Sequence, residues 1–139
     1  MPTRRNFIKH STFTGIILFC GIGFDSCSNA KYVYLSGDPS RLIVNKSDFS
    51  KNNFVILKHP QLSAPVYLGK KSDTEFIALM MLCTHKGCEV RPMGNFLICP
   101  CHGSEFSNSG KVLKSPATEN LREFQTRSDD NFVYVELKL

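Results

Sequence analysis

The sequence has no tryptophan and no apolar run long enough to cross a bilayer as a helix. The apolar stretch of residues 13–24 covers 12 residues, against the roughly 20 that a membrane-spanning helix needs, so a permanent span is not expected. The chain also lacks a strong excess of one charge, because 17 basic and 12 acidic residues give a formal charge of +5. Residues 1–26 carry +2 of that excess, and the remaining +3 is interspersed with acids, which argues against a nucleic-acid partner.

Helical periodicity is missing as well, since no stretch keeps apolar residues at a helical spacing over several turns. After residue 30 the chain instead breaks into short β-branched and aromatic runs separated by glycine, proline, serine and asparagine. This pattern predicts an all-β fold, a small antiparallel sandwich or barrel, for a single domain of residues 31–139. The expected strands span residues 32–35, 41–44, 54–58, 66–68, 76–82, 95–98, 121–126 and 132–137.

Residues 1–30 have the three-part layout of a secretory signal: a basic head, an apolar stretch, and a small, polar end. The head, Thr3-Arg4-Arg5-Asn6-Phe7-Ile8-Lys9, resembles the twin-arginine export motif at every position. The alternative is an ordinary signal whose arginines happen to be adjacent. Because twin-arginine signals belong to bacterial export, we expect the protein in the periplasm or on the outer face of the membrane.

The end of this signal allows two interpretations. Ser28-Asn29-Ala30 offers small residues for ordinary cleavage before Lys31. Alternatively, Phe24-Asp25-Ser26-Cys27 resembles a degraded lipoprotein box with Cys27 as the acylated residue, although Phe24 and Asp25 depart from the usual pattern. A lipid anchor explains an exported cysteine beside an apolar segment, so we favour lipidation at Cys27 and assign no function to Cys20.

Four cysteines and two histidines lie within residues 83–102. Cys83-Thr84-His85-Lys86-Gly87-Cys88 is followed by Cys99-Pro100-Cys101-His102-Gly103-Ser104. Each of these two boxes offers a thiolate and an imidazole to a metal from one short loop. The predicted strand of residues 95–98 separates the boxes, so we expect them at the tips of neighbouring loops. The other histidines are assigned to the leader (His10) and to a surface turn before Pro60 (His59).

Three kinds of site could use the residues of the two boxes. A disulfide scaffold would leave His85 and His102 without a role. A structural zinc site is chemically sound, but its common spacing separates a cysteine pair from a histidine pair, whereas here each box mixes the two. The third explanation is a [2Fe–2S] cluster with two thiolates on one iron and two imidazoles on the other. The mixed composition of each box favours this third explanation.

The two boxes resemble the Rieske iron–sulfur family, in the disulfide-containing branch found in cytochrome bc complexes. The resemblance implies a Rieske-type fold with two cluster-binding loops and one [2Fe–2S] cluster per chain. Carried over residue by residue, Cys83 and Cys99 would bind the inner iron. His85 and His102 would bind the outer, solvent-facing iron.

The resemblance also implies roles for residues beside the ligands. Cys88 and Cys101 match the pair that forms a disulfide between the two loops. Ser104 matches a serine that donates a hydrogen bond to a cluster sulfur, and Lys114-Ser115-Pro116-Ala117 resembles a proline loop that covers the cluster. High-potential members have a tyrosine where this chain has Phe106. The missing hydroxyl predicts a lower potential, within the Rieske range of about −150 to +300 mV, which suits a menaquinol-type donor better than ubiquinol.

The function implied is that of an exported electron-transfer protein working between a quinol-linked donor and a cytochrome, as an iron–sulfur subunit like that of quinol–cytochrome c reductase. His102 would accept the quinol hydrogen bond and proton, and the chain is not expected to catalyse alone. The short apolar run departs from the membrane helix of bc-complex subunits. One alternative is therefore the Rieske small subunit of another periplasmic oxidoreductase, such as arsenite oxidase. Another is a lipoprotein whose iron or zinc is structural.

Overall fold

The computed structural model describes residues 30–35, 40–49 and 52–137. The twin-arginine motif, Cys20, Cys27 and most of the predicted signal lie outside these residues. Within the described part, no helix is long and apolar enough to span a membrane.

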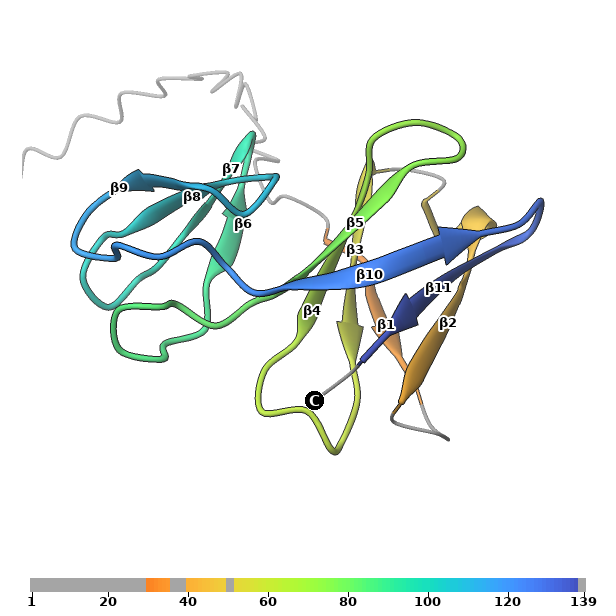
Figure 1. Ribbon diagram of the computed structural model, residues 1–139, viewed down its shortest axis with the longest axis horizontal. Helices are drawn as coiled ribbons and strands as arrows, with labels where there is room; N and C mark the ends of the chain where they lie inside the picture. The colour runs from red at the N-terminus through yellow and green to blue at the C-terminus, as the bar shows by residue number, and fades with distance from the viewer. Residues whose placement is uncertain (1–29, 36–39, 50–51, 138–139) are drawn as a thin grey trace, which may run out of the picture.

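The described chain is almost entirely β, which confirms the predicted fold class. Its one helical element among the described residues is a short 3₁₀ turn, η1, at Lys46–Phe49. The strands are β1 Tyr32–Tyr34, β2 Arg41–Asn45, β3 Phe54–Lys58, β4 Val66–Lys70, β5 Phe76–Met80, β6 Arg91–Met93, β7 Phe96–Ile98, β8 Glu105–Ser107, β9 Val112–Lys114, β10 Glu123–Ser128 and β11 Phe132–Glu136 (Figure 1).

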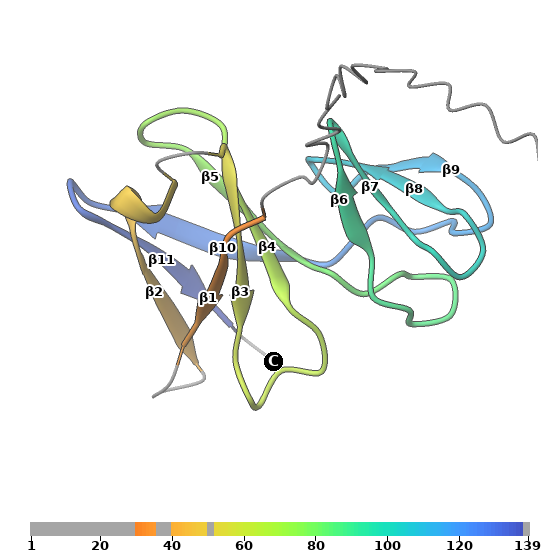
Figure 2. The same cartoon turned by 180° about the vertical axis from the view of Figure 1, so that it is seen from behind.

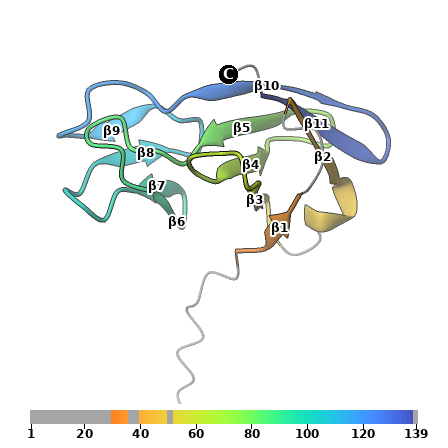
Figure 3. The same ribbon diagram turned by 90° about the horizontal axis from the view of Figure 1, so that it is seen from below.

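The strands form two sheets. Seven strands pair in the order β1-β3-β4-β5-β10-β11-β2, and four pair in the order β6-β7-β8-β9. All of these pairings are antiparallel except that of β1, which runs parallel to β3. The large sheet curls from β10 round to β1 (Figure 3). The small sheet is an insertion between β5 and β10, which are themselves neighbours in the large sheet, and it stands at one end of the molecule (Figures 1 and 2).

The outer and central strands of the large sheet are buried in different ways. β2 alternates buried and exposed residues, with Leu42 and Val44 directed into the core. In contrast, all of β5 and nearly all of β4 are buried, because each face of these strands packs against its own apolar cluster. One face lies in the core of the large sheet. The other face, including Ile77 and Leu79, packs with Leu97 and Phe106 of the small sheet.

The predicted strands are all present in the described residues, although some boundaries shift. The C-terminal hairpin begins at Glu123 rather than residue 121. Three further strands, β6, β8 and β9, were missed; each has three residues, and none shows an alternating pattern long enough to recognise. They are strands because β6 and β8 pair with β7 and β9 pairs with β8, in hairpins that such short segments do not reveal by their own pattern.

His59 corrects a second expectation. It does precede a turn, but its side chain is only 8% exposed rather than on the surface. Its Nδ1 accepts a hydrogen bond from the backbone N–H of Gln61 at 3.2 Å. Since this local bond satisfies the ring nitrogen, the imidazole can be buried beside the turn.

Gly110 lies in the turn between β8 and β9 of the small sheet, beside Leu79 of β5. This close approach predicts that a larger residue at position 110 lowers the stability of the fold. Gly110 has a positive φ of 81°, and a Cβ added there would lie 2.8 Å from Leu79 Cδ2. Gly110→Ala combines left-handed strain with overpacking, so we expect it to lower the free energy of unfolding by about 2 kcal/mol. Urea unfolding at matched cofactor content measures the loss.

Gly94 supplies the matched control. Its φ is also positive, at 62°, but nothing lies within 4 Å of the added Cβ. Gly94→Ala should therefore lose only the strain contribution, about 1 kcal/mol. Equal losses at both positions would show that Leu79 moves aside without penalty and that the close approach is unimportant.

Candidate metal centre

The two cysteine boxes fold into loops of the same backbone design. In the first, the N–H of Cys83 donates to the carbonyl of Cys88 at 2.8 Å, and that of Gly87 donates to the carbonyl of Cys83 at 2.8 Å. In the second, Cys99 N–H donates to the Ser104 carbonyl at 2.8 Å, and Gly103 N–H donates to the Cys99 carbonyl at 3.0 Å. Each loop is thus closed across the same number of residues, with its first cysteine at the base.

A glycine makes each closure possible. Gly87 has φ 73° and Gly103 has φ 76°, a left-handed conformation that residues with a Cβ adopt only under strain. A Cβ at either position would meet nothing within 4 Å, so the backbone conformation, rather than space, requires glycine. The sequence places both glycines one residue before the end of the closed turn.

Of the four side chains that the sequence marks as candidate ligands, two are buried thiols and two are neighbouring imidazole rings. Cys83 and Cys99 are free thiols, 2% and 1% exposed. The rings of His85 and His102 lie with centroids 4.9 Å apart and nearly perpendicular, at 86°. His102 is exposed and His85 is partly buried. The thiols therefore form the buried side of the site, and the imidazoles form its outer side.

The Nδ1 atom of His85 is the atom that best fits a metal ligand. It is buried and has no hydrogen-bond partner in the described part of the chain. Buried nitrogens of this kind are normally bonded, because leaving one unpaired is unfavourable. A metal bound through Nδ1 satisfies it. Two buried thiols, two imidazoles and this unpaired nitrogen fit a cluster with mixed cysteine and histidine ligation.

A disulfide ties the two loops to each other. Cys88 and Cys101 are bonded, with Cα atoms 6.5 Å apart, which is the pairing implied by the family resemblance. The Sγ atoms of Cys88, Cys99 and Cys101 all lie within 4.8 Å of one another. This trio is not a metal site in the oxidised chain, because two of its sulfurs are consumed in the disulfide.

A third segment, residues 115–119, is fastened to both loops. The backbone N–H of Ala117 donates to Ser104 Oγ at 2.9 Å, and Thr84 Oγ1 donates to the carbonyl of Glu119 at 2.7 Å. Because the Ser104 oxygen accepts here, its own proton remains available for donation. Ser104 is fully buried. The proline-loop assignment placed this segment near the site, but sequence reasoning missed Thr84, whose only signal is a hydroxyl between two ligand candidates.

Phe106 and Tyr67 belong to the apolar cluster that contains the two thiols. Phe106 lies on β8 and is completely buried, and as a phenylalanine it offers no hydroxyl to a neighbouring sulfur. Burial raises the pKa of Tyr67 to about 12, and its phenol stays protonated throughout the physiological range.

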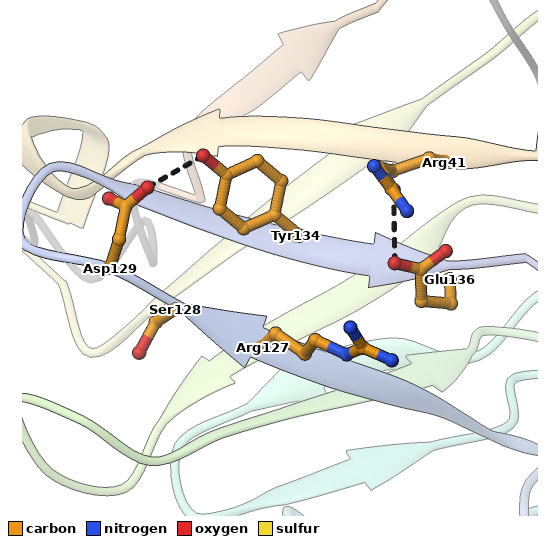
Figure 4. Close-up of a pocket in the computed structure, with 6 residues that line it drawn as sticks. All are labelled: Arg41, Arg127, Ser128, Asp129, Tyr134 and Glu136. Atoms are coloured by element: carbon orange, nitrogen blue, oxygen red, sulfur yellow. Dashed lines mark hydrogen bonds and ion pairs between the residues drawn. The ribbon is translucent and has the colours of Figure 1, made fainter.

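The molecule also has a pocket at the end away from the cysteine loops, on the exposed side of β10, β11 and β2 (Figures 1 and 4). Its volume is about 230 Å³. Tyr134 donates to Asp129 at 2.6 Å, and Arg41 pairs with Glu136 at 2.9 Å. The Tyr134 hydroxyl lowers the pKa of Asp129, assisted by the backbone N–H groups of Phe132 and Asn131. The pocket holds no thiol or imidazole, and most of its charges are already paired.

The sequence matches the family model of the Rieske [2Fe-2S] domain over residues 41–125. The cytochrome b6-f complex iron-sulfur subunit of Cyanothece sp. is 36% identical over 88 residues, covering 54% of this chain and 49% of that subunit. The mitochondrial cytochrome b-c1 complex subunit Rieske of Saccharomyces cerevisiae is 38% identical over 68 residues, covering 47% and 30%. The chain thus spans about half or less of these relatives.

Among solved structures, the cyanobacterial plasma membrane Rieske protein PetC3 from Synechocystis matches with a TM-score of 0.57. The sequences are 31% identical, and the match covers 67% of this chain and 98% of the other. The similarity therefore includes nearly all of that solved chain.

The bond from Thr84 predicts a measurable change in the third segment. Thr84→Val removes the donor to the Glu119 carbonyl. Loss of this hydrogen bond should cost about 1 kcal/mol, which raises roughly fivefold the fraction of molecules in which residues 115–119 have detached from the first loop. Hydrogen–deuterium exchange of the amides of residues 117–121 should accelerate accordingly. Thr118→Val is the matched control, because Thr118 is exposed and has no side-chain bond among the described residues. Unchanged exchange in the Thr84 variant would mean that the bond does not hold the segment.

Proposed function

The chain belongs to the Rieske [2Fe-2S] domain family, and we propose that it is an exported one-electron carrier between a quinol-linked donor and a cytochrome. Family membership implies one [2Fe–2S] cluster. The relatives named as subunits of cytochrome b6-f and b-c1 complexes support a cytochrome partner. A protein that relays electrons between other proteins needs its redox group near the surface, and the site meets this condition.

The observation that carries the proposal is the asymmetry of the four candidate ligands. We assign the buried Cys83 and Cys99 to the inner iron, and the more accessible His85 and His102 to the outer iron. When bound, the cluster supplies reversible one-electron chemistry at a potential tuned by its ligands and hydrogen bonds. Since His102 is exposed, a ring nitrogen not used for ligation can accept a hydrogen bond and a proton from a quinol hydroxyl.

Ser104 and the disulfide complete the proposed site. Ser104 Oγ accepts from Ala117, which orients the hydroxyl and leaves its proton for a cluster sulfur. The Cys88–Cys101 bond holds the two ligand loops together. Disulfides persist outside the reducing cytosol, so this bond supports the proposed export through the twin-arginine signal. Lipidation at Cys27 would then keep the domain at the outer face of the membrane.

Electron paramagnetic resonance tests the ligand assignment. The dithionite-reduced protein should give the rhombic signal of a mixed cysteine–histidine cluster, and His102→Ala should abolish it. Lys86→Ala is the control, because Lys86 is an exposed residue of the first cysteine loop and is not assigned as a ligand. An unchanged signal in the His102 variant, or zinc in place of iron in the purified protein, would overturn the proposal.

Phe106 predicts the direction of a change in midpoint potential. Phe106→Tyr adds a hydroxyl within the apolar cluster that contains Cys83 and Cys99. A hydrogen bond to a thiolate favours the more negative, reduced state. If that preference is about 1–2 kcal/mol, the potential rises by roughly 40–90 mV.

A redox titration followed by the same resonance signal measures this change. Phe96→Tyr on β7 is the control, because Phe96 is partly exposed and lies outside that buried cluster. A potential that is unchanged or lower in the Phe106 variant would remove the reason for expecting a low-potential, menaquinol-type donor.

A further inference from the structure

Three sulfur atoms are closer together than the proposed electron-transfer role requires. The Sγ atoms of Cys88, Cys99 and Cys101 all lie within 4.8 Å of one another. Cys88 and Cys101 form the disulfide, whereas Cys99 is a free thiol. A ligand and a loop tie could be placed well apart, but here a thiol stands beside the disulfide.

The backbone of the second loop fixes this proximity. Cys99 and Cys101 are separated only by Pro100, and the bonds of Cys99 to Ser104 and Gly103 close the turn around them. The disulfide then brings Cys88 of the first loop to the same place. No rearrangement of strands is needed for the three sulfurs to meet.

We propose that these three cysteines form an internal thiol–disulfide exchange site, which operates when the chain does not hold its cluster. The Cys99 thiolate attacks Cys88 Sγ, forming a Cys88–Cys99 bond as the Cys88–Cys101 bond breaks. The bonding electron pair leaves on Cys101 Sγ, which takes a proton from solvent, while the Cys99 proton has gone to solvent. One disulfide and one thiol are present before and after, so the exchange needs no external oxidant or reductant.

Cys88 is the target rather than Cys101. Attack on Cys101 would close a disulfide across Pro100 alone, and the fixed φ of proline restricts that short ring. A Cys88–Cys99 bond joins two loops that are already tied to each other, and it closes a longer and less restricted ring. The product therefore releases Cys101.

The exchange has a consequence for cluster loading, and this part rests on the proposed function. If Cys99 is a ligand of the inner iron, loading and exchange compete for the same sulfur. A loaded chain keeps the Cys88–Cys101 bond. A chain that loses its cluster, or is oxidised before loading, converts in part to a form in which Cys99 is blocked. That form cannot accept a cluster until the Cys101 thiolate attacks Cys88 in the reverse exchange and frees Cys99.

The two forms differ in which sulfur solvent can reach. Cys99 is 1% exposed, whereas Cys101 is exposed. An alkylating reagent therefore traps the exchanged form at Cys101 and draws the equilibrium toward it. The experiment uses the full chain with Cys20→Ser and Cys27→Ser, oxidised and freed of cluster without reductant. It is incubated with N-ethylmaleimide near pH 8, digested without reduction and mapped by tandem mass spectrometry. Fragmentation at Pro100 is needed to separate Cys99 from Cys101, because both lie on one peptide.

We expect label on Cys101 together with a Cys88–Cys99 linked peptide, and a loss of Cys101 label of at least tenfold in Cys99→Ser. Label confined to Cys83 and Cys99, with only the Cys88–Cys101 linkage present, would overturn the exchange. Cys83→Ser keeps all three sulfurs and should exchange as before, so its linkage map tests the proposal even if Cys99→Ser does not fold.

Two further comparisons distinguish a local exchange from scrambling by unfolding, and failure of the exchange from failure of the Cys99 ligand assignment. Cys83 is a second buried thiol outside the trio, so linkages that include it at the level of Cys88–Cys99 would show scrambling by unfolding and contradict a local exchange. The cluster-loaded chain should remain unlabelled at Cys101. Labelling there at the same rate as in the cluster-free chain would contradict the assignment of Cys99 as a ligand, whereas absence of label in the cluster-free chain contradicts the exchange itself.

Discussion

The paired backbone closure of the two cysteine loops is the constraint on which the rest of the site depends. In each loop the first cysteine both donates and accepts a backbone hydrogen bond, and a left-handed glycine completes the turn. This closure holds Cys83 and Cys99 at the buried base, so the histidines that follow them reach the outer side. The ring contact between His85 and His102, the disulfide and the fastening of residues 115–119 all require the loops to be in this position.

The large sheet gives these loops a rigid base. Its central strands are covered on both faces, once by the core of the sheet and once by the small sheet. Because β5 leads into the first loop and β10 returns directly beside it, the insertion begins and ends on neighbouring strands. The first ligand loop therefore follows directly from the fully buried β5, while the loop tips remain open to a partner.

Much of this arrangement could be predicted from local patterns, and the remainder depended on strand pairing and hydrogen bonds that leave no pattern in the sequence. Alternating or continuous apolar runs identified β2 and β5, and the mixed boxes identified the two loops whose His85 and His102 rings the structure places side by side. The strands β6, β8 and β9 were missed because their pairing, rather than their composition, makes them strands. The burial of His59 accompanies a bond from Gln61 within its turn, and the bond from Thr84 reaches Glu119, 35 residues away. Neither contact is marked by a sequence motif.

The parallel pairing of β1 with β3 determines how the domain carries mechanical load. The backbone bonds from Leu35 to Lys58 and from Ile56 to Lys31 lie at either end of β1, and the register runs in step between them. A pull on the chain ahead of Tyr32, directed along the strand, acts on these bonds in shear, so that they share the force rather than opening one after another.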